Sequence, residues 1–407
     1  MRAPGHGPVV RLTDGGVAAL RALDPAAPWL PAWRDLSRRP FVENLFYDPD
    51  FALAALGAFG DGVDILLVGD RPPEEPGLRL AAVWPCRRGR GRWGVPLRLT
   101  LGWMHGFGVF GVPLLDPEAP DRALDGLLRG AARLAGPRLM LPYVPTNGPF
   151  ADLLARACRR HGLARAEFWE HARAVLDLSD RTGPERAAYL DHLSPRRRRR
   201  LRQSAERLAP LIFETVRDPA DLRAALDDYI ALEGSGWKGR AGTAIGDAPG
   251  ESAFLHASVA AFGALGRVRI DRLRRDGTTL ASAVTFVGGA RAWCLKISFL
   301  EAEARDSPGA QLLHHLTRSL IADAALDGAD SCAPPDFRLA ETFWAERMPL
   351  AHVLIAAPGG DRLFGLARRL EGLRARMSRM LARRTWAQGR KGARAAGAPD
   401  APTSRSD

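Results

Sequence analysis

Residues 290–325 read ARAWCLKISFLEAEARDSPGAQLLHHLTRSLIADAA and predict a strand, a tight turn and a helix in succession. Large apolar residues alternate with smaller or polar ones from Trp293 to Phe299, and a period of two is typical of a strand. From Leu312 onward the apolar residues recur at helical spacing. Ser307 suits the N-cap position, and Pro308 suits the first turn, where its missing N–H would be unpaired anyway. This geometry presents free amides and the positive end of a helix dipole to an anion.

The segment resembles the GNAT acyltransferase superfamily, in particular its CelD-type branch, which is related to the FemAB transferases. The motifs that carry the resemblance are LKIS at 295–298, SPG at 307–309, SCAPPD at 331–336 and FW at 343–344. In that superfamily an R-x-x-G-x-G/A turn opens a helix and holds the pyrophosphate of acetyl-CoA, while the preceding strand lies along the pantetheine arm. Arg305 is one residue further from Gly309 than this pattern asks.

The resemblance implies acetyl-CoA as the acyl donor, with no metal ion. The residues expected at the pyrophosphate are Arg305, Ser307, Gly309, Ala310 and Gln311, the last three through their amides, and those expected along the pantetheine arm are Ile297, Ser298 and Phe299. The family usually has a tyrosine at the position of Phe299. A phenolic acid for the leaving thiolate is therefore missing here.

The use of lysine singles out two further positions. Only Lys238, Lys296 and Lys391 are lysines among 58 basic residues, and the first two fall in the motifs WKG and LKIS. A site that needs a compact ammonium or a neutral amine cannot accept arginine. Lys238 and Lys296 are therefore candidate catalytic residues, with chance placement as the alternative interpretation.

The resemblance also places the acceptor beside the glycine-rich loop at 234–246. There Glu233, Trp237 and Lys238 would line the acceptor side, and Trp344 would contact the acceptor as well. The alternative for Trp237 is that it packs the loop onto the core.

Acyl transfer needs a base that takes the proton of the nucleophile. Glu233 and Asp336 are the acidic candidates, and His314 or His315 are the other possibilities. Adjacent residues on a helix point in different directions, so we expect the two histidines not to face one site.

The order of predicted elements indicates an α/β (α+β) protein with two GNAT-like, FemAB-like domains in tandem, each a mixed, mostly antiparallel sheet flanked by helices. We expect a degenerate domain at 1–178, the acyltransferase domain at 179–357, a basic helix at 358–387 and a disordered tail at 388–407. The segments predicted to be helical include Val17–Leu23 and Phe337–Arg347, and His352–Ile355 is predicted to be a closing strand.

The net charge of +12 could suggest a nucleic-acid partner, but residues 361–407 alone carry twelve basic and four acidic residues. The run Arg196–Arg200 is interpreted first as a solvated helix face and second as a phosphate-binding surface. Its helix has no aromatic residue to stack bases, so we expect no specific nucleic-acid partner. Peripheral membrane contact through the basic tail is the other possibility.

No stretch is long and apolar enough to predict a transmembrane helix, and the N-terminus does not read as a signal peptide. Four widely spaced cysteines show no metal-ligand spacing, and free thiols favour a cytoplasmic location.

These patterns together predict an acyltransferase that moves an acetyl group from acetyl-CoA to an amine or hydroxyl of a small polar or glycan-linked acceptor. The glycan and a role in polysaccharide biosynthesis come from the CelD resemblance alone. Two alternatives stay open: FemAB-like aminoacyl transfer from tRNA, and a non-catalytic GNAT-like scaffold in polysaccharide production.

Overall fold

The computed structural model describes residues 7–334 and 337–395. Within these ranges the N-terminal half has strands β1 (Val9–Arg11), β2 (Val17–Ala22), β3 (Val63–Gly69), β4 (Leu80–Gly89), β5 (Leu99–Gly102), β6 (Leu114–Leu115), β7 (Arg138–Pro145) and β8 (Arg165–Asp177). Its helices are α1 (Leu30–Arg38), η1 (Leu45–Tyr47), α2 (Pro49–Phe59), α3 (Pro120–Leu134) and α4 (Gly148–Arg160).

The C-terminal half follows with strands β9 (Ile212–Val216), β10 (Val268–Arg275), β11 (Thr278–Gly288), β12 (Arg291–Phe299), β13 (Gly328–Asp330) and β14 (Glu346–Ala356). Its longer helices are α6 (Pro195–Leu208), α7 (Pro219–Ser235), α9 (Pro249–Gly263), α10 (Pro308–Ala322) and α11 (Phe364–Ala395). Short helical turns complete it, namely α5 (Gly183–Ala187), η2 (Tyr189–His192), α8 (Trp237–Arg240), η3 (Ile245–Asp247), η4 (Glu301–Asp306) and η5 (Ala340–Thr342).

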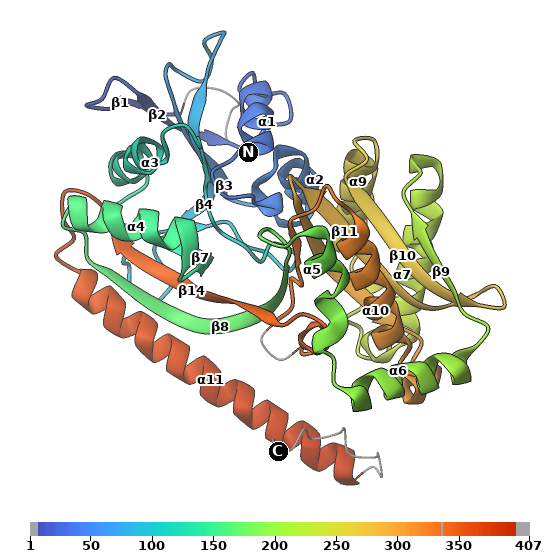
Figure 1. Cartoon of the computed structure of the whole chain (residues 1–407). Helices are drawn as coiled ribbons and strands as arrows, with labels where there is room; N and C mark the ends of the chain where they lie inside the picture. The colour runs from blue at the N-terminus through green and yellow to red at the C-terminus, as the bar shows by residue number, and fades with distance from the viewer. Residues whose placement is uncertain (1–6, 335–336, 396–407) are drawn as a thin grey trace.

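All strands join one mixed sheet in the order β1-β2-β3-β4-β5-β7-β14-β8-β13-β12-β11-β10-β9, with β6 beside β4 (Figure 1). The pairs are antiparallel except β5 with β7 and β12 with β13, each joined through a helix, α3 or α10. The predicted fold class, a mostly antiparallel mixed sheet flanked by helices in two similar halves, is confirmed.

The two halves are not separate sheets. Strand β14 comes from the C-terminal part of the chain but lies between β7 and β8, pairing antiparallel with both. Strand β8 also pairs with β13, so it joins the two halves. The predicted boundary at residues 178 and 179 falls just after β8, yet the closing strand of the second half is built into the sheet of the first.

Helices cover the two faces of the C-terminal sheet differently. Buried residues of α7 and α9 pack against Val284, Phe286 and Trp293. Helix α10 packs on the opposite face, where its leucines contact Ala281 and Ala283 of β11. The alternation along β11 therefore places α10, and the turn before it, on one defined face of the sheet.

Two segments differ from their predicted state. Val17–Leu23 has helix-forming residues, but residues 17–22 form β2, whose first five residues are buried between β1 and β3, so tertiary pairing overrides local preference. In 337–347 only η5 is helical and β14 begins at Glu346. The buried side chains of Phe343 and Trp344 and the return of the chain to the sheet leave no room for a longer helix.

The C-terminal helix is longer than predicted. It continues to Ala395, beyond residue 387, because the added residues include helix-favouring alanine, arginine and glutamine. The rest of the tail, 396–407, lies outside the described residues.

Candidate functional site

Strand β12 pairs with the short strand β13 only at its beginning. Arg291, Ala292 and Trp293 face Gly328, Ala329 and Asp330, and the pairing ends there. On its other side β12 stays paired with β11 up to Phe299. Within the part of the chain that the structure describes, the second half of β12 therefore has no strand partner on the side towards β13, which leaves a gap with a free strand edge.

Two local features open this gap. The register between β11 and β12 shifts at Leu295, and an extra residue of this kind bends a strand. After β13 the chain turns away at Cys332, which has a left-handed φ of 50°. Arg173 of β8 holds β13 on the other side, because its Nη2 donates to Asp330 Oδ2 at 2.7 Å and both side chains are buried.

The turn before α10 is anchored but only partly open. Ser307 occupies the N-cap position, as predicted, with a left-handed φ of 53° and no side-chain cap. The N–H groups of Ala310 and Gln311 donate to Ser307 O at 3.0 and 3.2 Å. The expectation of three free amides is therefore wrong, because the N-cap carbonyl already accepts two of them. Among the described residues, only Gly309 of the three has an amide without a hydrogen bond.

The surroundings of Gly309 are tight. A Cβ added there would lie 3.1 Å from Phe299 Cδ1 and 3.7 Å from Leu339 Cδ2. Phe299 is itself 37% exposed, so its ring lies between the turn and solvent. Arg305 is exposed, and no hydrogen bond or ion pair engages it in the described part of the chain. An anion at the turn would therefore meet the Gly309 amide and a free guanidinium, provided that the Phe299 ring moves aside.

Helix α6 braces the same turn. Ser204 Oγ donates to Asp306 O, and Arg207 forms an ion pair with the carboxylate of Asp306. Gln311, which is buried, donates from Nε2 to Leu201 O at 2.6 Å. The side chain of Gln311 thus binds α6, and this hydrogen bond holds α6 across the beginning of α10.

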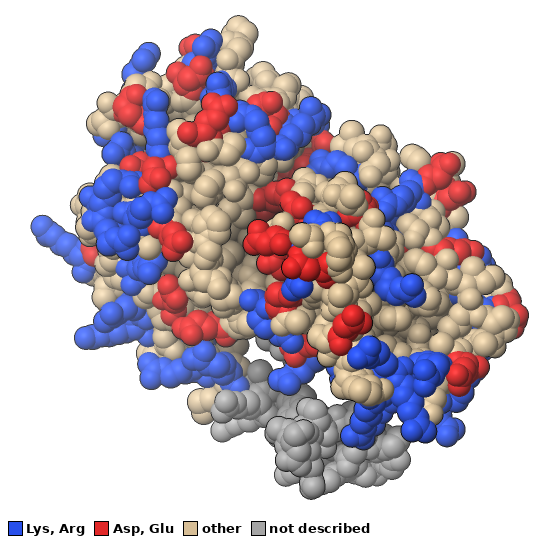
Figure 2. Space-filling model, viewed as in Figure 1, with Lys and Arg blue, Asp and Glu red and all other residues tan. Residues whose placement is uncertain are grey.

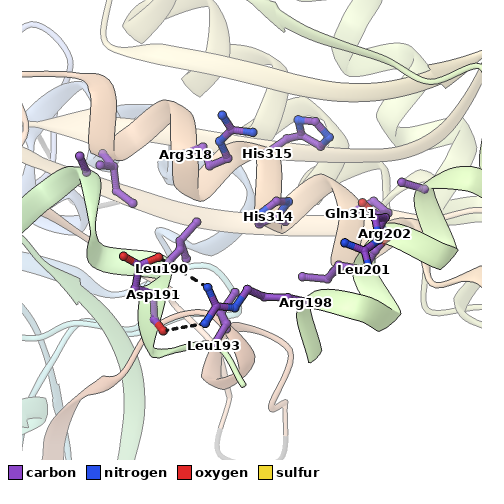
Figure 3. Close-up of a pocket in the computed structure, with 13 residues that line it drawn as sticks. Leu190, Asp191, Leu193, Arg198, Leu201, Arg202, Gln311, His314, His315 and Arg318 are labelled. Carbon is purple, nitrogen blue, oxygen red and sulfur yellow. Dashed lines mark hydrogen bonds and ion pairs between the residues drawn. The ribbon is translucent and has the colours of Figure 1, made fainter. Parts of the chain in front are cut away.

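A cavity of about 620 Å³ lies between η2, α6 and α10 (Figure 3). Gln311 is at one end of it, so the cavity continues from the turn along the outer side of α10. Its charged lining consists of Arg198, Arg202, Arg318 and Asp191. Figure 3 shows Arg198 turned towards Asp191, and the two groups lie 3.8 Å apart at their closest charged atoms.

The cavity is electropositive. Arg202 and Arg318 have no acidic partner among the described residues. His314 and His315 both line the cavity, with ring centroids 5.8 Å apart, so the expectation that they could not share a site is wrong. Burial, together with smaller effects of His315 and Arg318, lowers the pKa of His314 to about 4. Burial and the charge of Arg318 also lower the pKa of His315. Figure 2 shows basic side chains gathered over α6 beside this cavity.

Glu233 and Lys238 form the second cluster. The Lys238 ammonium donates to Glu233 Oε1, and the amide of Ile245 donates to Glu233 Oε2 at 2.9 Å. Tyr229 Oη also donates to this carboxylate, at 3.4 Å. Glu233 is 3% exposed, so this fully engaged carboxylate is better suited to hold Lys238 and the glycine-rich loop than to act as a base.

Lys296 lies near this pair on β12. Its Nζ is 4.2 Å from the centroid of the Phe107 ring, which belongs to the loop after β5 in the N-terminal half. Burial lowers the pKa of Lys296, and the positive charge of Lys238 lowers it further, against smaller opposing effects of Glu233 and Glu251. Within the described residues its ammonium makes no hydrogen bond or ion pair.

The glycine-rich loop is tied to the end of β12. The amide of Trp237 donates to Glu301 Oε1 at 2.6 Å, and Arg240 Nη2 donates to Glu301 Oε2 at 2.6 Å. The Trp237 side chain is 62% exposed. The alternative that Trp237 packs the loop onto the core is therefore wrong, and its ring is presented to solvent beside the turn.

Residues 195–334 match the family model described as "Acetyltransferase (GNAT) domain". This part of the C-terminal half is similar to a GNAT domain. The matched range begins with α6 and ends after β13, so it includes the gap, the turn and Lys296.

Solved structures extend the likeness to both halves. A crystal structure of FemX covers 80% of this chain and 95% of its own, with a TM-score of 0.54 and 10% identity. A conserved protein of unknown function from Bacteroides thetaiotaomicron covers 80% and 96%, with a TM-score of 0.52 and 8% identity. These likenesses show the fold alone. A search among curated proteins found no match.

Some predicted site residues lie apart from the gap beside β12 and the turn before α10. Trp344 is fully buried, and its Nε1 donates to Thr317 Oγ1 of α10 at 2.9 Å. It is a core residue, so the prediction that it contacts the acceptor is wrong. Asp336 lies outside the described residues. Ile297, Ser298 and Phe299 lie in the part of β12 that pairs with β11 and not with β13.

Several residues of the site were missed from the sequence. Phe107 belongs to the glycine-rich stretch at 102–111, but nothing local in that stretch points to Lys296. Glu301 reads as part of an acidic loop, and Arg202 and Arg318 are two among many arginines.

No helix in the described ranges is long and apolar enough to cross a membrane. Those ranges also hold no group of three or more histidine, cysteine or acidic residues placed to bind a metal ion.

Proposed function

We propose that the protein is an acyltransferase whose GNAT domain moves an acyl group, acetyl first among the candidates, from a CoA thioester to an amine or hydroxyl. The observation that carries this proposal is the free edge of β12 beside the turn of α10, with Lys296 on the same strand. A thioester arm bound along Ile297, Ser298 and Phe299 would replace the missing strand partner.

The charges around the turn support a phosphate-bearing donor. Arg305 and the Gly309 amide would contact the diphosphate. The basic cavity begins near the turn, at Gln311. The phosphate on the ribose of CoA would therefore contact Arg202 and Arg318, which line this cavity. Its apolar lining would receive the adenosine part.

Lys296 is the residue best suited to act as the base. A lowered pKa makes its neutral amine more abundant near neutral pH than that of an ordinary lysine. The neutral amine takes the proton of the attacking nucleophile as the bond to the acyl carbon forms. The same proton then passes to the sulfur as the carbon–sulfur bond breaks, which offsets the absence of a phenolic acid at Phe299.

The acceptor would lie between Lys296 and the exposed ring of Trp237, with the buried ring of Phe107 packed behind Lys296. These residues provide an aromatic wall and a positive charge, which suits a polar acceptor with a flat apolar surface such as a sugar ring. The CelD-type resemblance favours a glycan-linked acceptor and a role in polysaccharide production, and a cytoplasmic location remains part of this proposal.

Isothermal titration with acetyl-CoA tests the donor. We expect micromolar binding that Gly309→Trp abolishes, because even a Cβ at this position meets Phe299. A matched control is Gly91→Trp, where an added Cβ meets open space. The absence of CoA binding to the unaltered protein would contradict the proposal.

A second candidate is FemAB-like transfer of an aminoacyl group from tRNA. The likeness to FemX over both halves and the exposed run Arg196–Arg200 on α6 favour it. Binding of aminoacyl-tRNA in a gel-shift assay, together with no binding of CoA, would support it. Binding of neither molecule would favour a non-catalytic scaffold in polysaccharide production.

A further inference from the structure

Helix α11 has an inner face that packs on the sheet. Its buried residues Phe364 and Ala367 contact the cluster formed by β5, β7 and β14. Glu371 and Ala375 are buried one and two turns later. Figure 1 shows the helix running along the side of β8, with its later turns extending past the body of the protein.

The outer face of α11 carries an exposed apolar stripe. Leu366, Leu373, Met377 and Met380 are 46%, 50%, 62% and 57% exposed. Their spacings of seven, four and three residues place them on one side of the helix. Isolated exposed apolar residues are common on protein surfaces. A continuous apolar stripe on one helix indicates instead a surface that a membrane or another molecule covers.

The charge beside this stripe is almost entirely positive. Phe364–Ala395 contains ten basic residues and one acid, Glu371. That acid is turned inward and accepts hydrogen bonds from Arg92, Trp93 and Trp169. Among the described residues no carboxylate pairs with the exposed arginines of α11, which are Arg368, Arg369, Arg374, Arg376 and Arg379.

We infer that α11 is an interfacial anchor that lies on an anionic lipid surface, with the stripe inserted between the headgroups and the arginines around it. An amphipathic helix with apolar residues on one face and basic residues on the other has the properties of such anchors. Its polar face would gain from anionic headgroups, each nearby arginine adding to the attraction.

A second copy of this chain is the competing occupant of the stripe. Its spacing is also compatible with helix pairing. Two α11 helices side by side would bring their arginines together with no exposed acid on either helix to pair them. Charge therefore favours an anionic surface over self-association.

The test uses the full-length protein and flotation with lipid vesicles. We expect binding to phosphatidylcholine vesicles that contain about one quarter phosphatidylglycerol, and at least about tenfold weaker binding to pure phosphatidylcholine. Leu373→Ser, Met377→Ser and Met380→Ser combined should reduce binding at least about tenfold. A variant that combines Arg374→Gln, Arg376→Gln and Arg379→Gln should also bind the vesicles at least about tenfold more weakly, and its binding should depend less on salt concentration.

A matched control replaces exposed apolar residues elsewhere. Ile212→Ser and Leu265→Ser remove side chains that are 58% and 50% exposed, and they should leave vesicle binding unchanged. Circular dichroism of each variant checks that the fold is retained. Acetyl-CoA binding should be unaffected by the α11 variants, which separates this inference from the proposed acyl transfer.

Two results would overturn the inference. One is vesicle binding that is absent, or that the serine variant leaves unchanged. The other is a dimer in analytical ultracentrifugation that the serine variant converts to a monomer, which would show that a second copy covers the stripe.

Discussion

The ammonium of Lys296 on β12 lies 4.2 Å from the centre of the Phe107 ring, which belongs to the other half of the chain. Phe107 is 1% exposed, so this residue of the loop after β5 is packed in the hydrophobic core. The N-terminal half, which lacks an SPG-type turn, thereby contributes a buried ring that packs against Lys296 of the proposed acceptor site. A cation against an aromatic face is stabilised without an acidic partner, so the ammonium of Lys296 is held in position without an ion pair.

Removal of the Lys296 amine should abolish most of the turnover. Lys296→Met is expected to lower kcat by about 100-fold or more with acetyl-CoA affinity retained, because only proton transfer is lost. Phe107→Leu should lower kcat by a smaller factor, about tenfold, through loss of positioning. Phe150→Leu, which alters another fully buried ring far from the site, should leave kcat unchanged. Turnover that survives in Lys296→Met would remove this residue from the mechanism.

The pH dependence of turnover should follow Lys296. Its pKa is lowered, so the neutral amine accumulates at a lower pH than for an ordinary lysine of pKa 10.5, and kcat should rise with pH with a midpoint below that value. Lys238→Gln removes a like charge, which raises the Lys296 pKa and shifts the rise to higher pH. Lys238→Arg keeps the charge and should keep the midpoint, while it lowers kcat more than CoA affinity. A midpoint that stays in place in Lys238→Gln would contradict this coupling.

The turn of α10 should tolerate no side chain at position 309. Gly309→Ala puts a Cβ 3.1 Å from Phe299, so the ring must move towards the place proposed for the diphosphate. We expect CoA affinity to fall about tenfold and stability to fall by about 1 kcal/mol. Adding Phe299→Ala should restore part of the affinity in titration calorimetry. No recovery in the double variant would show that the two residues act independently.

The basic cavity should distinguish CoA from 3′-dephospho-CoA. With the unaltered protein we expect CoA to bind about tenfold or more tightly, because the extra phosphate meets Arg202 and Arg318. In Arg202→Gln combined with Arg318→Gln the two ligands should bind alike. Arg223→Gln, an exposed arginine of α7, serves as the control. If the preference persists in the cavity variant, the ribose phosphate binds elsewhere.

Glu371 should make the fold sensitive to acid. Burial favours its neutral form, but hydrogen bonds from Arg92, Trp169 and Trp93 outweigh this and lower its pKa from 4.5 to about 2. A lowered folded-state pKa stabilises the protein above pH 4.5, and this contribution is lost as the pH falls towards 2. Its size is roughly 3 kcal/mol at neutral pH.

Glu371→Gln should therefore lower the free energy of unfolding at pH 7 and flatten its decline between pH 5 and about 2, measured by urea denaturation. Glu206→Gln, on an exposed residue of α6, is the control and should change neither. If the free energy of unfolding falls equally steeply with decreasing pH in Glu371→Gln and in the unaltered protein, the Glu371 carboxylate is not the group that titrates.

The donor side of the site could be predicted from the sequence because it is local. A strand, an SPG turn and an amphipathic helix follow one another within residues 290–325, and the hairpins on either side of β11 turn at Asp276-Gly277 and Gly288-Gly289. Even here the number of free amides was overestimated, because the carbonyl of Ser307 accepts from two of them.

On the acceptor side, the sequence predicted which residues are of interest but not where their side chains lie. The pairing of Lys238 with Glu233 lies within one short stretch, so both residues were recognised together. Whether Trp237 faces solvent and Trp344 the core depends on what packs against each ring. Glu301 and Thr317, which decide this, lie in other parts of the chain.

The sequence by itself determined the elements whose residues are neighbours: the turn, its helix, the three strands β10 to β12, and a strongly basic C-terminal helix. Only the tertiary structure decided that β14 enters the sheet between β7 and β8, that Val17–Ala22 is a strand, and that Phe107 contacts Lys296. The physical reason is that local patterns act through nearest-neighbour hydrogen bonds and side-chain periodicity. Strand order and the walls of a site depend instead on burial shared between residues far apart in the chain.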